Sequence, residues 1–437
     1  MPTLPPTLCR FDFSIRGAAR SLACAGLALT AALPLALAQS GYGVGPAAEV
    51  PKIPAAAPAP QGAFDYLTQG KLSGAARYRY ENYAQDSVPG ATTAAAGRID
   101  GNAVASTLRL TLGYETLPCH GLTAFVEGEG VYAVGEDEHY RMTTVPGQSD
   151  QPRAVINDPL GTELNQAFLK WQLPDTGVML LAGRESFFLN NGRFVSYSPW
   201  RQNNQSIDLA RTSVKFGDGY TANYAYLNKV HRVVGADATD GDLGMNSHVG
   251  SFDYAKMGVF NASAYAVLLD YDDNAGQAAN DTATTGLRLT GPYKFDDTWS
   301  VVYTADYAHQ TDYADNPANV ALDYWCVELG VGYKAHKAYF GWTVLEGGSG
   351  NTFRTPLAHP FNGWTEKFAA TPGSGLDARY LTFTGPVPGV CERRREHRLF
   401  LAVTKSPVVK ADDRPRQGPI IRPGQLAGSS ARRSFMR

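Results

Sequence analysis

Apolar and polar residues alternate along much of the chain, most clearly between residues 299 and 346. Trp299, Val301, Tyr303 and Tyr307 alternate with polar residues, and a second run starts at Trp325. Alternation with a period of two predicts β-strands that have one apolar and one polar face. A soluble sandwich would bury the apolar face, whereas a membrane barrel turns it to lipid and turns the polar face to a wet lumen.

The same alternation predicts about fourteen strands. They cover residues 70–83, 107–115, 122–134, 162–173, 177–188, 206–216, 220–230, 247–254, 258–270, 282–291, 298–308, 325–334, 340–344 and 376–383. Short connections such as Pro174-Asp175-Thr176 and Gly217-Asp218-Gly219 alternate with long ones. This rhythm is typical of bacterial outer-membrane barrels, and a Greek-key sandwich has no reason to keep it. The sequence therefore predicts an all-β fold, a transmembrane antiparallel up-and-down β-barrel.

The chain divides into four predicted parts. Residues 1–38 are typical of a signal peptide, with a basic region, an apolar region and the cleavage site Ala36-Leu37-Ala38. A membrane anchor is less favoured, because the apolar run is short and contains Pro34. Residues 39–63 are a linker rich in Pro and Ala, and residues 64–385 form the barrel. Residues 386–437 are a basic segment without alternation, either a periplasmic tail or, as we favour, sequence read out of frame.

Composition narrows the function. The 437 residues carry a net charge of −2 and only 18% are charged, so no global field points to nucleic acid. No run of about 20 apolar residues lies beyond the N-terminus, which excludes a helical membrane protein. The sequence has no Gly-x-Ser-x-Gly motif, and its histidines are scattered over loops and strand ends. We therefore predict that the protein is not an enzyme and needs no cofactor or metal.

Basic residues recur on the predicted polar faces and in one long loop. We predict that they bind an anionic substrate, because arginine keeps its charge and binds carboxylates through two parallel hydrogen bonds. The predicted substrate-binding residues are Arg77, Arg79, Arg109, Lys170, Arg184, Arg193, Arg201, Arg211, Lys215 and Arg288. Alternatively, the arginines brace the barrel by pairing with carboxylates such as Glu81, Glu129 and Asp306. Both roles are compatible with the pattern.

The long loop from Asn190 to Asn204 is predicted to narrow or gate the lumen. Its segment Trp200-Arg201-Gln202-Asn203-Asn204-Gln205 combines an aromatic ring with amide groups, which suit carbohydrate. The same residues could instead form an ordered constriction packed inside the barrel, which is the interpretation that we favour.

Several segments resemble the alginate-export family of outer-membrane barrels, from about residue 64 to residue 385. They are Arg77-Tyr78-Arg79-Tyr80-Glu81, Gly161-Thr162-Glu163-Leu164-Asn165-Gln166-Ala167, Gly183-Arg184, Asn191-Gly192-Arg193-Phe194, Trp200-Arg201-Gln202-Asn203, Tyr224-Ala225-Tyr226-Leu227, Phe361-Asn362-Gly363-Trp364 and Lys367-Phe368. The resemblance implies a monomeric barrel of about eighteen strands with an electropositive lumen that passes an acidic polysaccharide. This chain then lacks about four strands.

The sequence and the resemblance together predict a channel in the bacterial outer membrane for an anionic, alginate-like polysaccharide or oligosaccharide. Its expected partners are outer-membrane lipid and the polymer, with periplasmic export components as candidates and no nucleic acid. A porin for other small anions or nutrients is the alternative, and a structural barrel without a transport role is a third possibility.

Overall fold

The computed structural model describes residues 10–13, 62–83, 103–135, 140, 142, 144–146, 153–256, 259–272, 276–348, 350–357, 370–385 and 401–404. Most of the predicted signal peptide, linker and C-terminal segment lies outside these ranges, so their boundaries stay predictions. Within the ranges the chain is almost entirely β-structure.

One antiparallel sheet of 16 strands contains nearly all of the regular structure, and each strand pairs with the next along the chain apart from a small hairpin. The fourteen strands that correspond to the sequence prediction are β2 (Lys71–Tyr83), β3 (Ala103–Glu115), β4 (Leu122–Ala133), β5 (Gly161–Gln172), β6 (Val178–Glu185), β7 (Ser206–Phe216), β8 (Tyr220–His231), β9 (Asp242–Lys256), β10 (Phe260–Leu269), β11 (Thr282–Lys294), β12 (Trp299–Asp312), β13 (Ala321–Tyr333), β14 (His336–Leu345) and β17 (Leu376–Thr384). The predicted up-and-down barrel topology is therefore confirmed.

The remaining elements are short. The strands β1 (Arg10–Phe13) and β18 (Leu401–Thr404) extend the sheet beside β2 and β17, and β15 (Gly347–Gly348) pairs with β16 (Asn351–Thr352). Helix α1 (Ala63–Thr68) precedes β2, and the 3-10 turn η3 (Ala278–Asn280) precedes β11. None of the described helices is long and apolar enough to cross a membrane. Strand β18 lies in the segment for which the sequence predicts no alternating strand.

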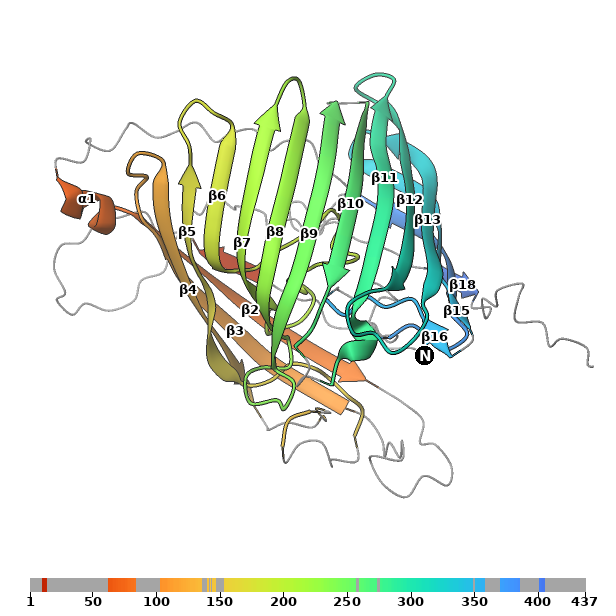
Figure 1. The fold of residues 1–437 in the computed structure, drawn as a ribbon, viewed down its shortest axis with the longest axis horizontal. Helices are drawn as coiled ribbons and strands as arrows, with labels where there is room; N and C mark the ends of the chain where they lie inside the picture. Colours follow the sequence, from red (N-terminus) through yellow and green to blue (C-terminus); the bar gives the residue numbers. More distant parts are fainter. Residues whose placement is uncertain are drawn as a thin grey trace, which may run out of the picture.

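The connections are sorted by length between the two ends of the sheet. Short turns join strands at the upper end in Figure 1, and long segments join them at the lower end. The turn between β7 and β8 needs backbone conformations with positive φ, which Gly217 (53°) and Gly219 (91°) supply without a steric penalty. Below, the two ends are called the short-turn end and the long-loop end.

The sheet curves so that its two faces differ. Large apolar side chains are exposed on the outer face, for example Leu112 (63%), Leu287 (65%) and Leu329 (62%). Aromatic residues gather on this face at the short-turn end, where the ring centroids of Trp299 and Tyr333 lie 4.9 Å apart. An exposed apolar band with an aromatic border is what a strand wall in contact with lipid requires.

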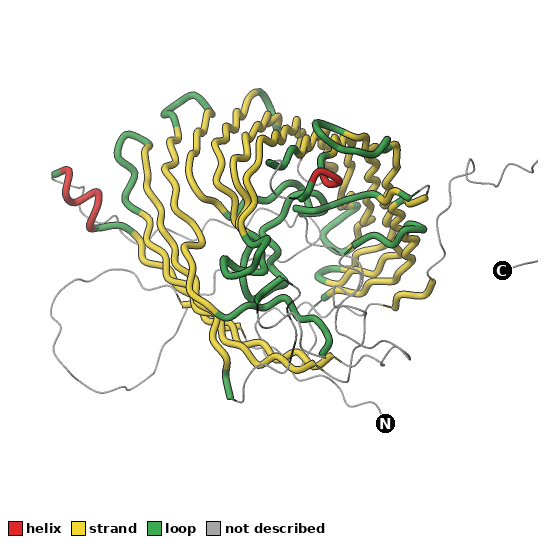
Figure 2. The backbone as a smooth tube through the Cα atoms, turned by 60° about the horizontal axis from the view of Figure 1, so that its bottom comes forward, coloured by secondary structure: helices red, strands yellow, loops and turns green. Residues whose placement is uncertain are grey.

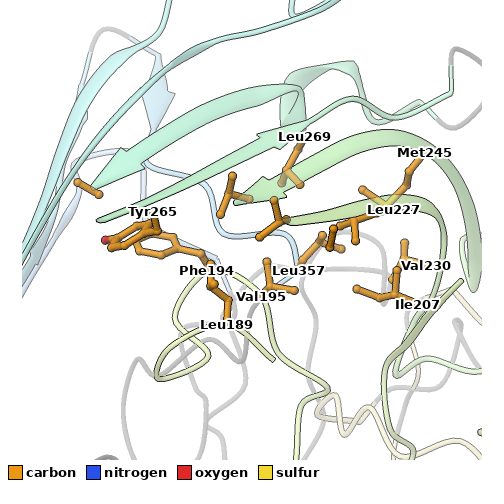
Figure 3. Packing of buried hydrophobic residues seen from close by; sticks show 14 of the residues in the cluster. Leu189, Phe194, Val195, Ile207, Leu227, Val230, Met245, Tyr265, Leu269 and Leu357 are labelled. Atoms are coloured by element: carbon orange, nitrogen blue, oxygen red, sulfur yellow. The ribbon is translucent and has the colours of Figure 1, made fainter. Parts of the chain in front are cut away.

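The long segments fold back inside the curve of the sheet, where Figure 2 shows loop backbone surrounded by strands. Their apolar residues pack against the inner face: Val195 and Leu357 belong to one buried cluster with the strand residues Ile207 and Leu227 (Figure 3). All four side chains are at most 1% exposed. The interior of the long-loop end is therefore packed like the core of a soluble domain.

Candidate functional site in the interior of the barrel

The loop of residues 186–205, here called the inner loop, is attached to the first strands of the sheet. The guanidinium group of Arg77 on β2 donates hydrogen bonds to the carbonyl oxygens of Pro199 (2.8 Å), Trp200 (2.7 Å) and Arg201 (3.0 Å). A charged donor that satisfies three consecutive carbonyl groups fixes the loop backbone on the wall.

Charged groups form a network around this attachment. Arg79 on β2 pairs with Glu81 and donates to the carbonyl oxygen of Trp200, whose ring centroid lies 4.8 Å from the guanidinium carbon. Arg201 approaches Glu81 (3.7 Å) and Asp158 (3.9 Å), and the Asp158 side chain is fully buried. Burial of these charges requires that they stay paired, so the network is structural.

The amide residues of the inner loop are used for packing rather than presented to the lumen. Gln202 is fully buried, and its Nε2 donates to the carbonyl oxygen (3.0 Å) and the hydroxyl oxygen (2.9 Å) of Thr107 on β3. Gln205 Nε2 donates to the carbonyl oxygens of Ser196 (2.7 Å) and Leu357 (3.0 Å). These contacts favour the ordered constriction over an exposed carbohydrate patch.

The opposite side of the inner loop contacts strands β10–β13. Phe194 packs with its ring centroid 5.4 Å from those of Tyr265 and Tyr324, and the guanidinium carbon of Arg193 lies 5.4 Å from the Tyr324 ring centroid. The residues 195 and 357 also form a parallel β-bridge. The inner loop is thus held from both sides of the barrel and by a second long segment, which indicates a fixed constriction rather than a moving gate.

Three more predicted substrate-binding residues form ion pairs on the inner face. The distances between nitrogen and oxygen are 2.5 Å for Arg109 and Glu129, 2.6 Å for Arg211 and Glu185, and 2.6 Å for Arg288 and Asp306. Each of these carboxylates neutralises the positive charge of an arginine that was predicted to bind an anionic substrate. The bracing role that the sequence left open is therefore what the geometry supports for these arginines.

The two predicted lysines lie near the short-turn end of the inner face. Lys170 pairs with Glu115 at 3.0 Å, and both side chains are about one-third exposed (36% and 35%). Lys215 is exposed and has no ion-pair partner within the described ranges. Of the ten predicted residues, Lys215 is the one whose charge the described structure leaves open to solution.

Arg184 departs from the expected lumen position. It pairs in register with Ala167, while the neighbouring Ala182 pairs with Leu169, which is 56% exposed on the outer face. Arg184 shares that face because residues two apart on a strand point the same way. It binds Asp208 at 2.8 Å in an outer-face cluster with His231. Apolar residues lie on both faces of β6, so its sequence does not alternate clearly and could not show which face points to the lumen.

Within the described ranges, no group of three or more His, Cys, Asp or Glu side chains is placed to hold a metal ion. The arrangement on the inner face is instead a set of internal ion pairs around a fixed loop, with the exposed Lys215 near the short-turn end.

Comparison of the sequence with protein-family models gives no match, and comparison with curated protein sequences gives none. Solved structures do match. OccAB2 of Acinetobacter baumannii has a TM-score of 0.56 at 15% identity, covering 75% of this chain and 79% of that one. OccAB3 of the same organism has a TM-score of 0.55 at 11% identity, covering 74% and 77%. The structure titled OpdK of Pseudomonas aeruginosa with vanillate has a TM-score of 0.51 at 10% identity, covering 72% and 76%.

This chain has the fold of the Occ and Opd outer-membrane porins. At these identities the likeness establishes the fold alone. It also corrects the sequence analysis, because the matching structures are Occ and Opd proteins and not alginate-export proteins. Of the segments that suggested the alginate-export family, Arg77-Tyr78-Arg79-Tyr80-Glu81 alternates basic and aromatic residues, as an outer-membrane barrel strand can do in any family. Such a segment indicates barrel geometry and does not identify the family.

Sequence reasoning missed several residues that build the interior. Asp158, Phe353, Arg354 and Leu357 lie in long segments without a regular period, yet Asp158 and Phe353 are fully buried. The available signal was weak: an apolar residue in a polar loop, such as Phe353 or Leu357, has no reason to face solvent.

Proposed function

We propose that the protein is an outer-membrane channel, not an enzyme, that passes small anionic solutes through a fixed constriction. The observation that carries the proposal is the inner loop, which Arg77 and Gln202 hold on one wall and Phe194 and Leu357 hold from the other side. A loop fixed across the lumen suits small solutes better than a bulky polymer, because the opening cannot widen without breaking these contacts.

The barrel fold, the exposed apolar band and the aromatic border support a location in the bacterial outer membrane with lipid around the wall. The charges support an anionic preference, since Lys215 near the short-turn end is exposed and has no ion-pair partner within the described ranges, whereas Arg109, Arg211 and Arg288 are paired. One chain supplies the whole inner wall that is described, so we propose a monomer.

The proposal is tested by conductance of the purified protein in planar bilayers, with small monocarboxylates and neutral sugars of similar size as competing solutes. We expect discrete channels whose current the carboxylates reduce at lower concentrations than the sugars do. Equal effects of both solutes would contradict the anionic preference.

A variant of the inner-loop attachment tests the constriction. Arg77→Met keeps the apolar stem and removes the three hydrogen bonds to the inner loop, each worth about 1.5–3 kcal/mol for a charged donor before discounting for solvent. We expect noisier and larger single-channel currents than in the unchanged protein. The matched control is Arg379→Met, because Arg379 lies on the outer face over the Trp342 ring; its currents should not change.

A structural barrel without a transport role is the second candidate. The buried apolar cluster of the long-loop end favours it, because packed side chains fill interior space. The absence of any channel from a correctly folded sample would decide for this candidate.

A further inference from the structure

The lysines and arginines of this protein are distributed differently along the barrel axis. Among the lysines whose side chains are described, all but Lys229 lie at the short-turn end, namely Lys71, Lys170, Lys215, Lys294, Lys334 and Lys337. The described arginines lie in the middle of strands or at the long-loop end. Lysines at the short-turn end and arginines further along the barrel axis suggest that the two kinds of basic residue have different roles.

Strand register shows that five of these lysines point to the inner face, because residues an even number apart on a strand share a face. Lys71 shares a face with Arg77, which contacts the inner loop, and Lys170 shares one with Phe168, which packs against the interior cluster. Lys215 shares a face with Leu209 of the same cluster.

The same reasoning places the other two. Lys294 shares the face of Arg288, whose partner Asp306 accepts a hydrogen bond from the buried Tyr265. Lys337 shares the face of Tyr339, which is 8% exposed. The five residues stand on β2, β5, β7, β11 and β14, so they are spread around the sheet. We call Lys71, Lys170, Lys215, Lys294 and Lys337 the lysine collar.

Fewer carboxylates form ion pairs with the lysine collar than with the arginines of the inner face. Lys170 pairs with Glu115, and no other ion pair of the collar is found within the described part of the chain. Three further carboxylates face inward near this end, and each accepts hydrogen bonds from neutral groups. Asp253 accepts from Asn223 and Ser251, both at 2.7 Å. Glu127 accepts from Asn165 (2.7 Å) and Gln166 (3.0 Å), and Glu328 accepts from the Tyr380 hydroxyl (2.7 Å). Other carboxylates lie in the turns beyond the strands. One of them, Asp296, accepts hydrogen bonds from the backbone N–H groups of Thr298 and Trp299.

We propose that the lysine collar is the anion-selective element of the channel, placed at the short-turn mouth of the lumen. Lys71, Lys215 and Lys294 are exposed, and Lys170 and Lys337 are partly exposed. Ammonium groups around a low-dielectric opening raise the local concentration of anions. Lysine binds them as a flexible point charge, weakly and at several positions, so they can leave again. The inference rests on the proposed channel function and assigns its selectivity to residues other than the paired arginines.

The test compares two double variants that remove the same charge. The collar variant is Lys215→Gln with Lys294→Gln, and the control is Lys229→Gln with Arg379→Gln, whose side chains are exposed on the outer face (40% and 49%). Reversal potentials in a salt gradient give the permeability ratio of chloride to potassium. We expect the ratio to fall at least about twofold in the collar variant and to stay unchanged in the control.

Ionic strength supplies a second readout. The difference should shrink between about 0.1 M and 1 M salt, because the Debye length falls from about 10 Å to about 3 Å. Lys215→Arg with Lys294→Arg should keep the original ratio, which separates a charge effect from a folding defect. An unchanged ratio in the collar variant, with normal conductance, would overturn the collar and leave the channel proposal intact. No conductance in the unchanged protein would overturn both.

Discussion

Asp306 on β12 shows how a single residue holds the inner face together. Its carboxylate is 3% exposed and accepts hydrogen bonds from Arg288 Nη1 (2.6 Å) and from the Tyr265 hydroxyl (2.8 Å). Tyr265 in turn lies over Gly286 of the next strand, where a Cβ atom would stand 2.4 Å from its ring. One carboxylate thus connects β10, β11 and β12.

Asp306→Asn should destabilise the protein by about 3–5 kcal/mol, because the change leaves the buried Arg288 charge without compensation. The free energy of unfolding in detergent, measured by urea titration with fluorescence detection, checks this. The double variant Arg288→Met with Asp306→Leu should recover most of the loss, since an apolar pair can replace a buried ion pair at little cost. A double variant that is less stable than Asp306→Asn would contradict this account.

For single residues, the sequence predicted which side chains face inward better than it predicted their partners. It identified Arg109, Arg211 and Arg288 as inward residues and left open whether they bind substrate or brace the wall, and the structure supplies carboxylate partners for all three. The partners stand on neighbouring strands, and strand register cannot be read from one sequence. For Arg184 even the face was uncertain, because β6 carries apolar residues on both sides.

Strands were the most predictable elements of the chain. Each predicted strand is present, and the differences lie at the ends: β9 starts at Asp242 and β13 at Ala321, several residues earlier than the alternation predicts. In these extensions the apolar residues Leu243, Met245, Leu322 and Tyr324 are buried on the inner face, and the outward positions carry polar or small residues. The outer face there no longer has to be apolar. Bulges such as the one between Glu127 and Gly128 shift the register without any clear sign in the sequence.

Glycines inside the strands permit close contact between neighbours. At Gly330 on β13 an added Cβ atom would stand 2.1 Å from the Ala338 carbonyl oxygen and 2.3 Å from the Tyr339 Cβ atom. Gly330→Ala should therefore destabilise the barrel by about 1–3 kcal/mol, because backbone must move to make room.

The matched control is Gly128→Ala on β4, where the nearest atom to the new Cβ would be 3.9 Å away. That variant should lie within about 1 kcal/mol of the unchanged protein. Heat-modifiability on gels, which compares mobility before and after boiling, ranks the two variants by the temperature at which the folded band disappears. Equal temperatures would show that the contact at Gly330 is not limiting.

For the whole molecule, the separation between lipid-facing and interior aromatic residues can be measured directly. Trp299 is 50% exposed on the outer face near the short turns, whereas Trp200 lies in the inner loop under Arg79. In vesicles that contain brominated lipid, a variant with Trp299 as its single tryptophan should lose most of its fluorescence. A variant with Trp200 alone should lose little, and equal quenching would contradict the assignment of the two faces.

The interior could not be predicted at this scale. Strand alternation reports the wall, but the loops that fill it have no period, and their apolar residues are scattered over distant positions such as Val195, Phe353 and Leu357. The alternating lengths of the connections showed which end carries the long segments. They gave no sign that these segments turn inward.

The contact between Gln205 and Leu357 spans 152 residues and has a consequence for how the protein matures. A pairing across so much chain forms slowly, because the intervening loop must first be closed at an entropic cost. We therefore expect the inner loop to reach its final position only after β8–β14 have formed and brought residue 357 alongside it. We infer that each new molecule passes through a stage in which its wall is largely formed and its lumen is not yet narrowed by the inner loop.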